Sequence, residues 1–129
     1  MNLNRFITDP KLEQEGVWID VEDVRLKIAR VKNPKHEAAF AERMRPYRGR
    51  KLTEDEQLEV LVQTMADHVL LGWEGTLTLD GEPLEYSRDN AVRALRIRNF
   101  ADMVTAIGSD LENFRNEQMR QAVEVLAKN

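Results

Sequence analysis

The sequence predicts an α+β fold: a mostly helical single domain with an N-terminal β-hairpin and a small central hairpin. Residues 17–28 alternate apolar and polar side chains with a period of two, which is typical of half-buried strands. Residues 53–69 repeat apolar side chains at helical spacing behind a capping signal. Asp80-Gly81 joins two short alternating runs, and Asp-Gly strongly favours a tight hairpin.

Size and composition suit one domain. A chain of 129 residues is long enough to bury a sizeable core. It has no cysteine, which excludes disulfides and thiolate metal sites, and no apolar run long enough for a membrane helix. We expect residues 1–15 to form a flexible N-terminal arm, and residues 16–129 to form one domain whose last turns are free to project. The first residues lack a secretory pattern, so we expect a cytoplasmic protein.

The first half of the chain contains two predicted strands and two predicted helices. The strands cover residues 17–21 and 24–28 and are joined at Glu22-Asp23. Asn33-Pro34 opens a helix that ends near Arg45-Pro46, before a basic loop. The clearest helix begins at Thr53, where a capping box with Glu56 satisfies free backbone amides. Its expected core face consists of Leu58, Leu61, Val62, Met65 and Val69.

A compound motif follows between His68 and Ala91. We expect the helix to continue to an end at Gly72, and Trp73 to plug the core between small neighbours. The Asp80-Gly81 turn then joins the runs Leu77–Leu79 and Leu84–Tyr86, and Ser87 caps a short helix.

The C-terminal third predicts more helix. Asn99 is the expected N-cap, and the apolar phase continues unchanged through Gly108. We therefore expect one long helix, although Ser109 to Glu112 is itself a possible capping box. The positions at helical spacing are Phe100, Met103, Val104, Ile107, Leu111 and Phe114.

Residues suited to catalysis or metal binding do not cluster in the sequence. His36 and His68 lie far apart without carboxylates at ligand spacing, and no phosphate-binding loop or nucleophile elbow is present. We expect no enzyme activity, no metal and no cofactor.

The charge distribution is lopsided. The net charge is −4, but residues 25–51 hold ten Lys or Arg against two Glu. The densest part, with Tyr47 inside it, contains the candidate electrostatic patch Arg43, Arg45, Arg48, Arg50 and Lys51. Three interpretations are open: nucleic-acid binding with Tyr47 stacked on a base, a solvated loop, or a patch for acidic protein surface, including another copy of the chain. The acidic overall balance argues against nucleic acid.

The central motif resembles that of the tail assembly chaperones of long, flexible-tailed (siphovirus-type) bacteriophages. The residues that carry the resemblance are Val69-Leu70-Leu71-Gly72-Trp73-Glu74-Gly75, Asp80-Gly81-Glu82-Pro83-Leu84, Tyr86-Ser87 and Asn90-Ala91. The preceding order of a strand pair, an Asn-Pro boundary and a helix is also similar. The structural motif residues are Gly72, Trp73, Gly75, Asp80, Gly81, Tyr86 and Ser87.

The resemblance implies a non-catalytic protein of phage assembly. Such proteins coat the tape measure protein, help recruit tail tube protein, and self-associate into rings or spirals. They act in the host cytoplasm and are not expected in the mature virion. Candidate protein-binding residues are Phe100, Met103, Val104, Ile107 and Met119, although a stripe of this kind is more often intramolecular core. The alternative function is a small nucleic-acid-binding regulator that uses residues 43–51.

Overall fold

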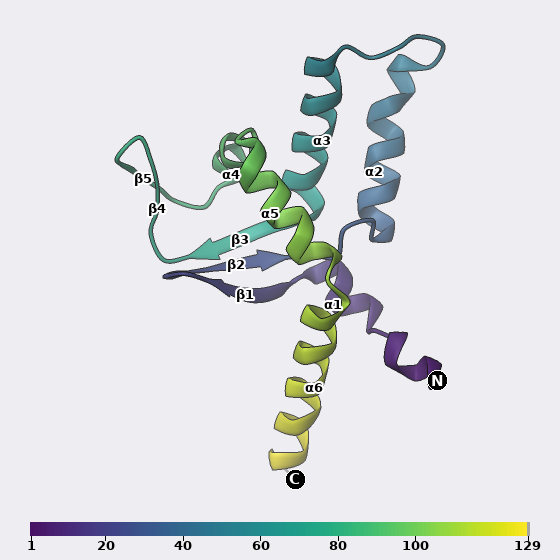
Figure 1. Ribbon diagram of the computed structural model, residues 1–129, viewed down its shortest axis with the longest axis vertical. Coiled ribbons are helices and arrows are strands. Elements are labelled where there is room, and N and C mark those ends of the chain that lie inside the picture. Colours follow the sequence, from purple (N-terminus) through teal and green to yellow (C-terminus); the bar gives the residue numbers. More distant parts are fainter. Residues whose placement is uncertain (129) are drawn as a thin grey trace.

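A three-stranded antiparallel sheet, in the order β1-β2-β3, lies at the centre of the protein. The computed structural model describes residues 1–128 and confirms the α+β fold, with helices around this sheet and a separate two-stranded hairpin (Figure 1). The elements of the first half are η1 Leu3–Phe6, α1 Pro10–Glu15, β1 Val17–Val21, β2 Val24–Ile28, α2 Pro34–Met44, η2 Arg45–Tyr47 and α3 Glu54–His68. Those of the second half are β3 Leu70–Glu74, β4 Leu77–Leu79, β5 Glu82–Leu84, α4 Arg88–Leu95, α5 Arg98–Ser109 and α6 Leu111–Lys128.

The predicted N-terminal hairpin is confirmed at its expected bounds. Strand β1 pairs with β2 from Val17↔Ile28 to Val21↔Val24, and Glu22 turns the chain with a φ of 54°. Apolar side chains of β2, such as Leu26, are fully buried because helices cover that face of the sheet.

Residues 70–74 correct the prediction of a helix that continues to Gly72. Helix α3 ends at His68, and Leu70–Glu74 forms strand β3, antiparallel to β2. The Val69 carbonyl accepts a hydrogen bond from the Ala29 amide at 2.8 Å, at the start of this pairing. Gly72 stops no helix: it is a buried strand residue opposite Lys27. Residues 70–74 do not alternate apolar and polar side chains, so their sequence resembles the end of a helix. Their partner strand lies more than 40 positions away along the chain, so the local sequence does not reveal the pairing.

The central hairpin forms at the predicted turn. Strands β4 and β5 pair from Leu77↔Leu84 to Leu79↔Glu82, and Asp80 and Gly81 both have positive φ, as a tight primed turn requires. The second strand is shorter than predicted, because it ends at Leu84 and does not reach Tyr86.

Helix α3 keeps its predicted start and most of its predicted core face, since Val62, Met65 and Val69 are buried. Thr53 and Glu56 form both bonds of the capping box. Leu58 and Leu61, expected in the core, are 42% and 48% exposed. Val62, Met65 and Ala66 pack in the main core, and Thr64 and Val60 are buried on the side that meets α2. The cap predictions hold for α2 at Asn33 and for α4 at Ser87.

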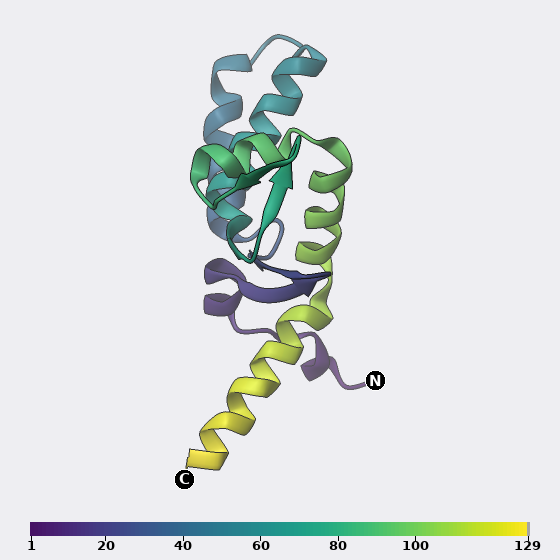
Figure 2. The same cartoon turned by 90° about the vertical axis from the view of Figure 1, so that its left-hand side faces the viewer.

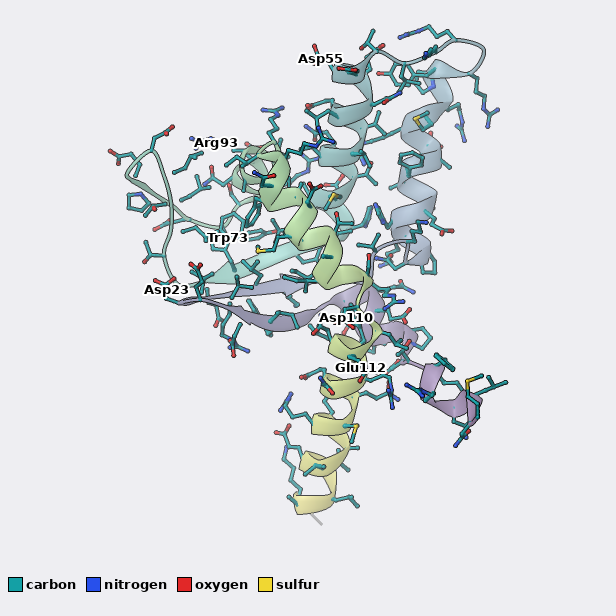
Figure 3. The ribbon with its side chains drawn as sticks, in the orientation of Figure 1. Asp23, Asp55, Trp73, Arg93, Asp110 and Glu112 are labelled. Carbon is teal, nitrogen blue, oxygen red and sulfur yellow. The ribbon has the colours of Figure 1, made fainter. Side chains whose placement is uncertain are left out.

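The C-terminal region forms two helices, where one long helix was expected. Asp110 separates α5 from α6, and its carboxylate accepts from the Glu112 amide at 3.0 Å, at the junction labelled in Figure 3. Gly108 lies against the chain after β2, and its carbonyl accepts from the Val31 amide at 2.9 Å. Helix α5 begins at Arg98 with Ile97 as its N-cap, so the expected cap Asn99 lies inside the helix.

Residues 1–15, the expected N-terminal arm, include two short helical segments. They contain η1 and α1, and Asp9 caps α1 by accepting from the Lys11 amide. Leu12 is buried with Val17 and Phe114 in a small second cluster. A helix of six residues is too short to show an amphipathic period, so the sequence pattern did not predict α1.

The elements form an elongated arrangement. Helices α2 and α3 lie side by side at one end, the sheet lies in the middle, and α6 extends from the other end (Figures 1 and 2). The main core joins the sheet to α3, α4 and α5. No helix among residues 1–128 is both long enough and apolar enough to span a membrane.

Alanine substitutions at two glycines should change the free energy of unfolding in different ways. At Gly108 a Cβ would lie 2.8 Å from Val31 Cγ2 and 2.9 Å from the Ala29 carbonyl oxygen, whereas at Gly72 the nearest atoms are at 3.7 Å. We expect Gly108→Ala to lose about 1–2 kcal/mol of unfolding free energy, since overpacking costs more than the helix propensity gained. Gly72→Ala, the matched control, should be neutral or slightly stabilising. Urea unfolding measures both, and equal stabilities would contradict the close approach at Gly108.

Candidate protein-binding surfaces

An apolar cleft lies between α2, α3 and α5. Its volume is about 480 Å³. Phe40 from α2 and Leu61 from α3 are 39% and 48% exposed along it. The full set of lining residues is Val31, Lys32, His36, Glu37, Phe40, Leu61, Met65 and Thr105. We call this surface the α2–α3–α5 cleft.

The buried side chain of Asn33 holds the start of α2 beside the end of α3. Its Oδ1 accepts from the His36 amide at 3.1 Å, which caps α2. Its Nδ2 donates to the carbonyls of Arg30 at 2.8 Å and His68 at 3.1 Å. One side chain therefore ties the start of α2 to the end of α3.

His36 closes the base of the cleft as a neutral ring. Its Nδ1 accepts from the Lys32 amide at 2.9 Å, so the neutral ring carries its proton on Nε2. Burial lowers the pKa of His36, and the nearby His68 lowers it further against a smaller opposing effect of Glu37. His36 lines the cleft as a hydrogen-bonded structural residue.

An ion cluster around Asp67 ties α2 and α4 to α3. The Asp67 carboxylate accepts from Arg43 at 2.6 Å and from Arg88 Nε at 2.6 Å, and Arg88 also donates to Gln63 at 2.6 Å. Burial opposes ionisation of Asp67, but the hydrogen bonds from Arg88 and Arg43 outweigh it, so its pKa is lowered. This cluster sets the distance between the helices at the side of the cleft.

The predicted electrostatic patch is partly neutralised within the chain. Arg43 pairs with Asp67, Arg45 with Glu42, and Arg50 with Glu56. The Arg50 hydrogen bond is the main reason that the pKa of Glu56 falls to about 2.

Arg50 also lies 4.8 Å from the centre of the Tyr47 ring, the face that a stacked base would occupy. Within residues 1–128, Arg48 and Lys51 are exposed and form no ion pair. The patch therefore contributes two unneutralised cations to the surface.

The central motif residues form a joint between the sheet and α4. Trp73 is 7% exposed, as expected of a plug, and its Nε1 donates to the Leu84 carbonyl at 3.0 Å. The Tyr86 ring meets it edge-on, with centroids 5.1 Å apart. Figure 3 shows Trp73 between β3 and the β4–β5 hairpin. Gly75 has a φ of 93° and leaves no room for a Cβ beside the Asp23 carbonyl, whereas Gly81 is open at the turn.

The candidate protein-binding stripe divides between core and surface. Val104 is fully buried, and Ile107 is half-buried against the core. Phe100 and Met103 are half-buried and line a hollow of about 560 Å³ beside the β1–β2 turn and β4. Met119 lies on α6 and is 62% exposed. These residues therefore do not form one continuous binding face.

Sequence reasoning missed the residues of the cleft. Leu61 was assigned to the core, and Phe40 was given no role. The available signal was the excess of apolar positions on α3, since a stripe wider than one contact face leaves some of them uncovered. No group of three or more metal-binding side chains occurs within residues 1–128.

The lowered pKa of His36 predicts acid sensitivity of the fold. Below its ordinary value of 6.5 the unfolded state takes up a proton that the folded ring resists, so stability falls as pH falls. We expect His36→Gln to flatten the dependence of unfolding free energy on pH between about 7 and 5. Urea unfolding across this range measures the slope. At lower pH, where carboxylates such as Asp67 titrate, the variant should show the same pH dependence of unfolding free energy as the wild type. An unchanged dependence between about pH 7 and 5 would contradict the role given to His36.

Comparison with known proteins places the chain among phage proteins. A family model described as YdaY prophage protein matches residues 23–125, from the β1–β2 turn to near the end of α6. No curated protein matches the chain, and no solved structure does. The family match confirms the expectation of a phage protein. Because it covers most of the chain, including the cleft and the central joint, the protein belongs to the YdaY prophage protein family.

Proposed function

We propose that this prophage protein is a non-catalytic tail assembly chaperone. It binds the tape measure protein in the host cytoplasm, helps to recruit tail tube protein, associates with copies of itself, and is left out of the mature virion. Two findings support the proposal: membership of a prophage family, and the central motif by which the chain resembles tail assembly chaperones.

The α2–α3–α5 cleft is the observation that carries this proposal. A tape measure protein is long and helical, and an amphipathic helix binds by laying an apolar stripe into a groove. The cleft offers such a groove, with Phe40 and Leu61 exposed along it and Met65 and Thr105 among its other lining residues. Covering the exposed parts of Phe40 and Leu61 contributes about 1 kcal/mol each.

A second uncovered apolar surface suits the same function. On α6, Met119, Val123 and Leu126 are 62%, 64% and 73% exposed and lie at spacings of four and three residues along one helix face. Helix α6 extends away from the sheet (Figure 2), and only the N-terminal segment at Asn4 and Ile7 comes near this face, at Met119. An adaptable methionine next to branched side chains suits a partner with varied apolar stretches.

Blocking the cleft tests the proposal. Thr105→Arg puts a long charged side chain into the cleft, and Ala106→Arg puts the same side chain on an exposed position of the same helix. We expect Thr105→Arg to weaken binding at least about tenfold, because the bound helix would bury an unpaired charge. Co-expression with the tape measure protein of the same gene cluster, followed by pull-down and titration of the purified complex, measures the effect.

The matched variant separates the possible results. Ala106→Arg should bind like the wild type and keep the tape measure protein soluble. Equal binding by both variants would move the site away from the cleft. A tape measure protein that stays insoluble and unbound beside folded wild-type chain would contradict the chaperone function itself.

A further inference from the structure

The hollow of about 560 Å³ beside the β1–β2 turn and β4 is a separate candidate binding surface. We call it the β4 hollow. Leu77 from β4 and Phe100 and Met103 from α5 are half-buried along it. It shares no lining residue with the α2–α3–α5 cleft. A molecule bound in the β4 hollow and a helix bound in the cleft would therefore contact different residues.

One side of the β4 hollow is the free edge of strand β4. This strand pairs only with β5 among residues 1–128. Thr76, Leu77 and Thr78 all line the hollow. Successive side chains of a strand point to opposite faces of a sheet. A surface that includes three consecutive residues of β4 therefore follows the edge of the strand.

The register of the hairpin shows which backbone groups face outward. Leu79 and Glu82 flank the two-residue turn, so they form the hydrogen-bonded pair that closes it. The next pair, Thr78 and Pro83, is therefore a non-hydrogen-bonded pair, whose backbone groups point away from the partner strand. Pro83 has no N–H and so protects the β5 edge from further pairing. Thr78 presents both an N–H and a carbonyl, so β4 is the unprotected edge.

The rim of the β4 hollow is acidic. Glu22 and Asp23 line it, are exposed and form no ion pair within residues 1–128, and no lining residue is basic. Arg25, which follows them on β2, is paired with Asp20 and Glu74. The two carboxylates of the β1–β2 turn therefore remain available to a partner.

The surroundings of the hollow do not reverse this charge. Residues 75–87 contain three carboxylates and no Lys or Arg. On α5, Arg98 and Asp102 are both exposed one turn apart and offset each other. Figure 3 shows Arg93 on α4, well away from Asp23 at the β1–β2 turn. The hollow therefore favours an apolar segment that carries Lys or Arg.

We infer that an extended segment of a partner protein, with alternating apolar and basic side chains, adds as a strand to the free edge of β4. Its backbone pairs with the outward N–H and carbonyl of Thr78, as in other cases of strand addition. Its apolar side chains cover Leu77 and the half-buried side chains of α5, and its cations face Glu22 and Asp23. This partner differs from the helix proposed for the cleft, so the inference goes beyond the proposed function.

The acidic rim also disfavours a second copy of the chain as the occupant. Pairing of two β4 edges would place the rims of both copies against each other. Like charges brought together across paired strands are destabilising. Charge thus guards an edge that proline does not protect, and leaves it open to a basic segment.

Thr78→Pro tests the backbone pairing. It removes the outward N–H of β4 but no hydrogen bond between β4 and β5. Thr78→Val, the matched control, removes the hydroxyl and keeps the N–H. The probe is a labelled short peptide that alternates lysine and valine, titrated by fluorescence anisotropy. We expect Thr78→Pro to weaken binding at least about tenfold and Thr78→Val to bind like the wild type. Urea unfolding checks that both variants are folded.

Charge variants test the rim with the same peptide. Glu22→Gln combined with Asp23→Asn should weaken binding at least about fivefold and reduce its dependence on salt. Glu15→Gln combined with Asp55→Asn neutralises two exposed carboxylates elsewhere and should bind like the wild type. A peptide with glutamate in place of lysine should bind the wild type at least about tenfold more weakly.

Hydrogen exchange gives a direct readout of strand addition. The Thr78 amide should exchange more slowly in the peptide complex than in the free protein, because a backbone hydrogen bond then protects it. Three results would overturn the inference: no binding of the lysine–valine peptide, equal binding by Thr78→Pro, or equal binding of the glutamate peptide. A wild type that self-associates through an edge lost in Thr78→Pro would assign the edge to a second copy instead. Thr105→Arg, which blocks the cleft, should leave peptide binding unchanged, so this test and that of the chaperone function fail separately.

Discussion

The packing of Trp73 is the constraint on which the rest of the structure depends. In the β2–β3 ladder this residue pairs with Leu26, so its backbone belongs to the main sheet. Its indole N–H donates to the Leu84 carbonyl in the hairpin, and Tyr86 packs edge-on against its ring just before α4 begins. A buried ring of this size contributes a large apolar area, and its N–H would be costly without a partner. One side chain thus fixes the sheet, the hairpin and the entry of α4.

The same logic explains why the helix pair leaves surfaces uncovered. Polar contacts hold α2 against α3: Asn33 binds the His68 carbonyl at one end, and Arg43 binds Asp67 along the side. These contacts fix the separation of the helices without filling the space between them. Phe40 and Leu61 therefore remain partly exposed.

Charge is distributed so that each surface has its own character. Arg43, Arg45 and Arg50 are bound to carboxylates of the same chain and act in the fold. Arg48 and Lys51 remain exposed in the loop after α2, close in sequence to the exposed carboxylates Glu54 and Asp55, and the carboxylates of the β4–β5 hairpin lie on the other side of the molecule. The α2–α3–α5 cleft is lined mainly by apolar side chains and lies apart from the hairpin carboxylates.

The sequence by itself determined the features that depend on neighbouring residues. The β1–β2 hairpin, the Thr53–Glu56 capping box and the Asp80-Gly81 turn follow from periodicity and short-range hydrogen bonding. Burial of Trp73 also followed, because a large ring between glycines has few other uses. The resemblance carried by the same motif indicated a phage protein, which the family match confirms.

Only the tertiary structure decided what depends on distant parts of the chain. Residues 70–74 form a strand because β2 is there to pair with them. The last helix divides near Gly108 because that turn packs on the segment after β2, and Asp110 then caps a new helix. Leu61 is exposed because no element covers that side of α3, and Arg48 differs from Arg50 because only Arg50 has a carboxylate in reach. A strand needs a partner strand, an apolar side chain needs an element to cover it, and a charged side chain needs an opposite charge. The fold brings each of these second groups close, and the local sequence does not specify them.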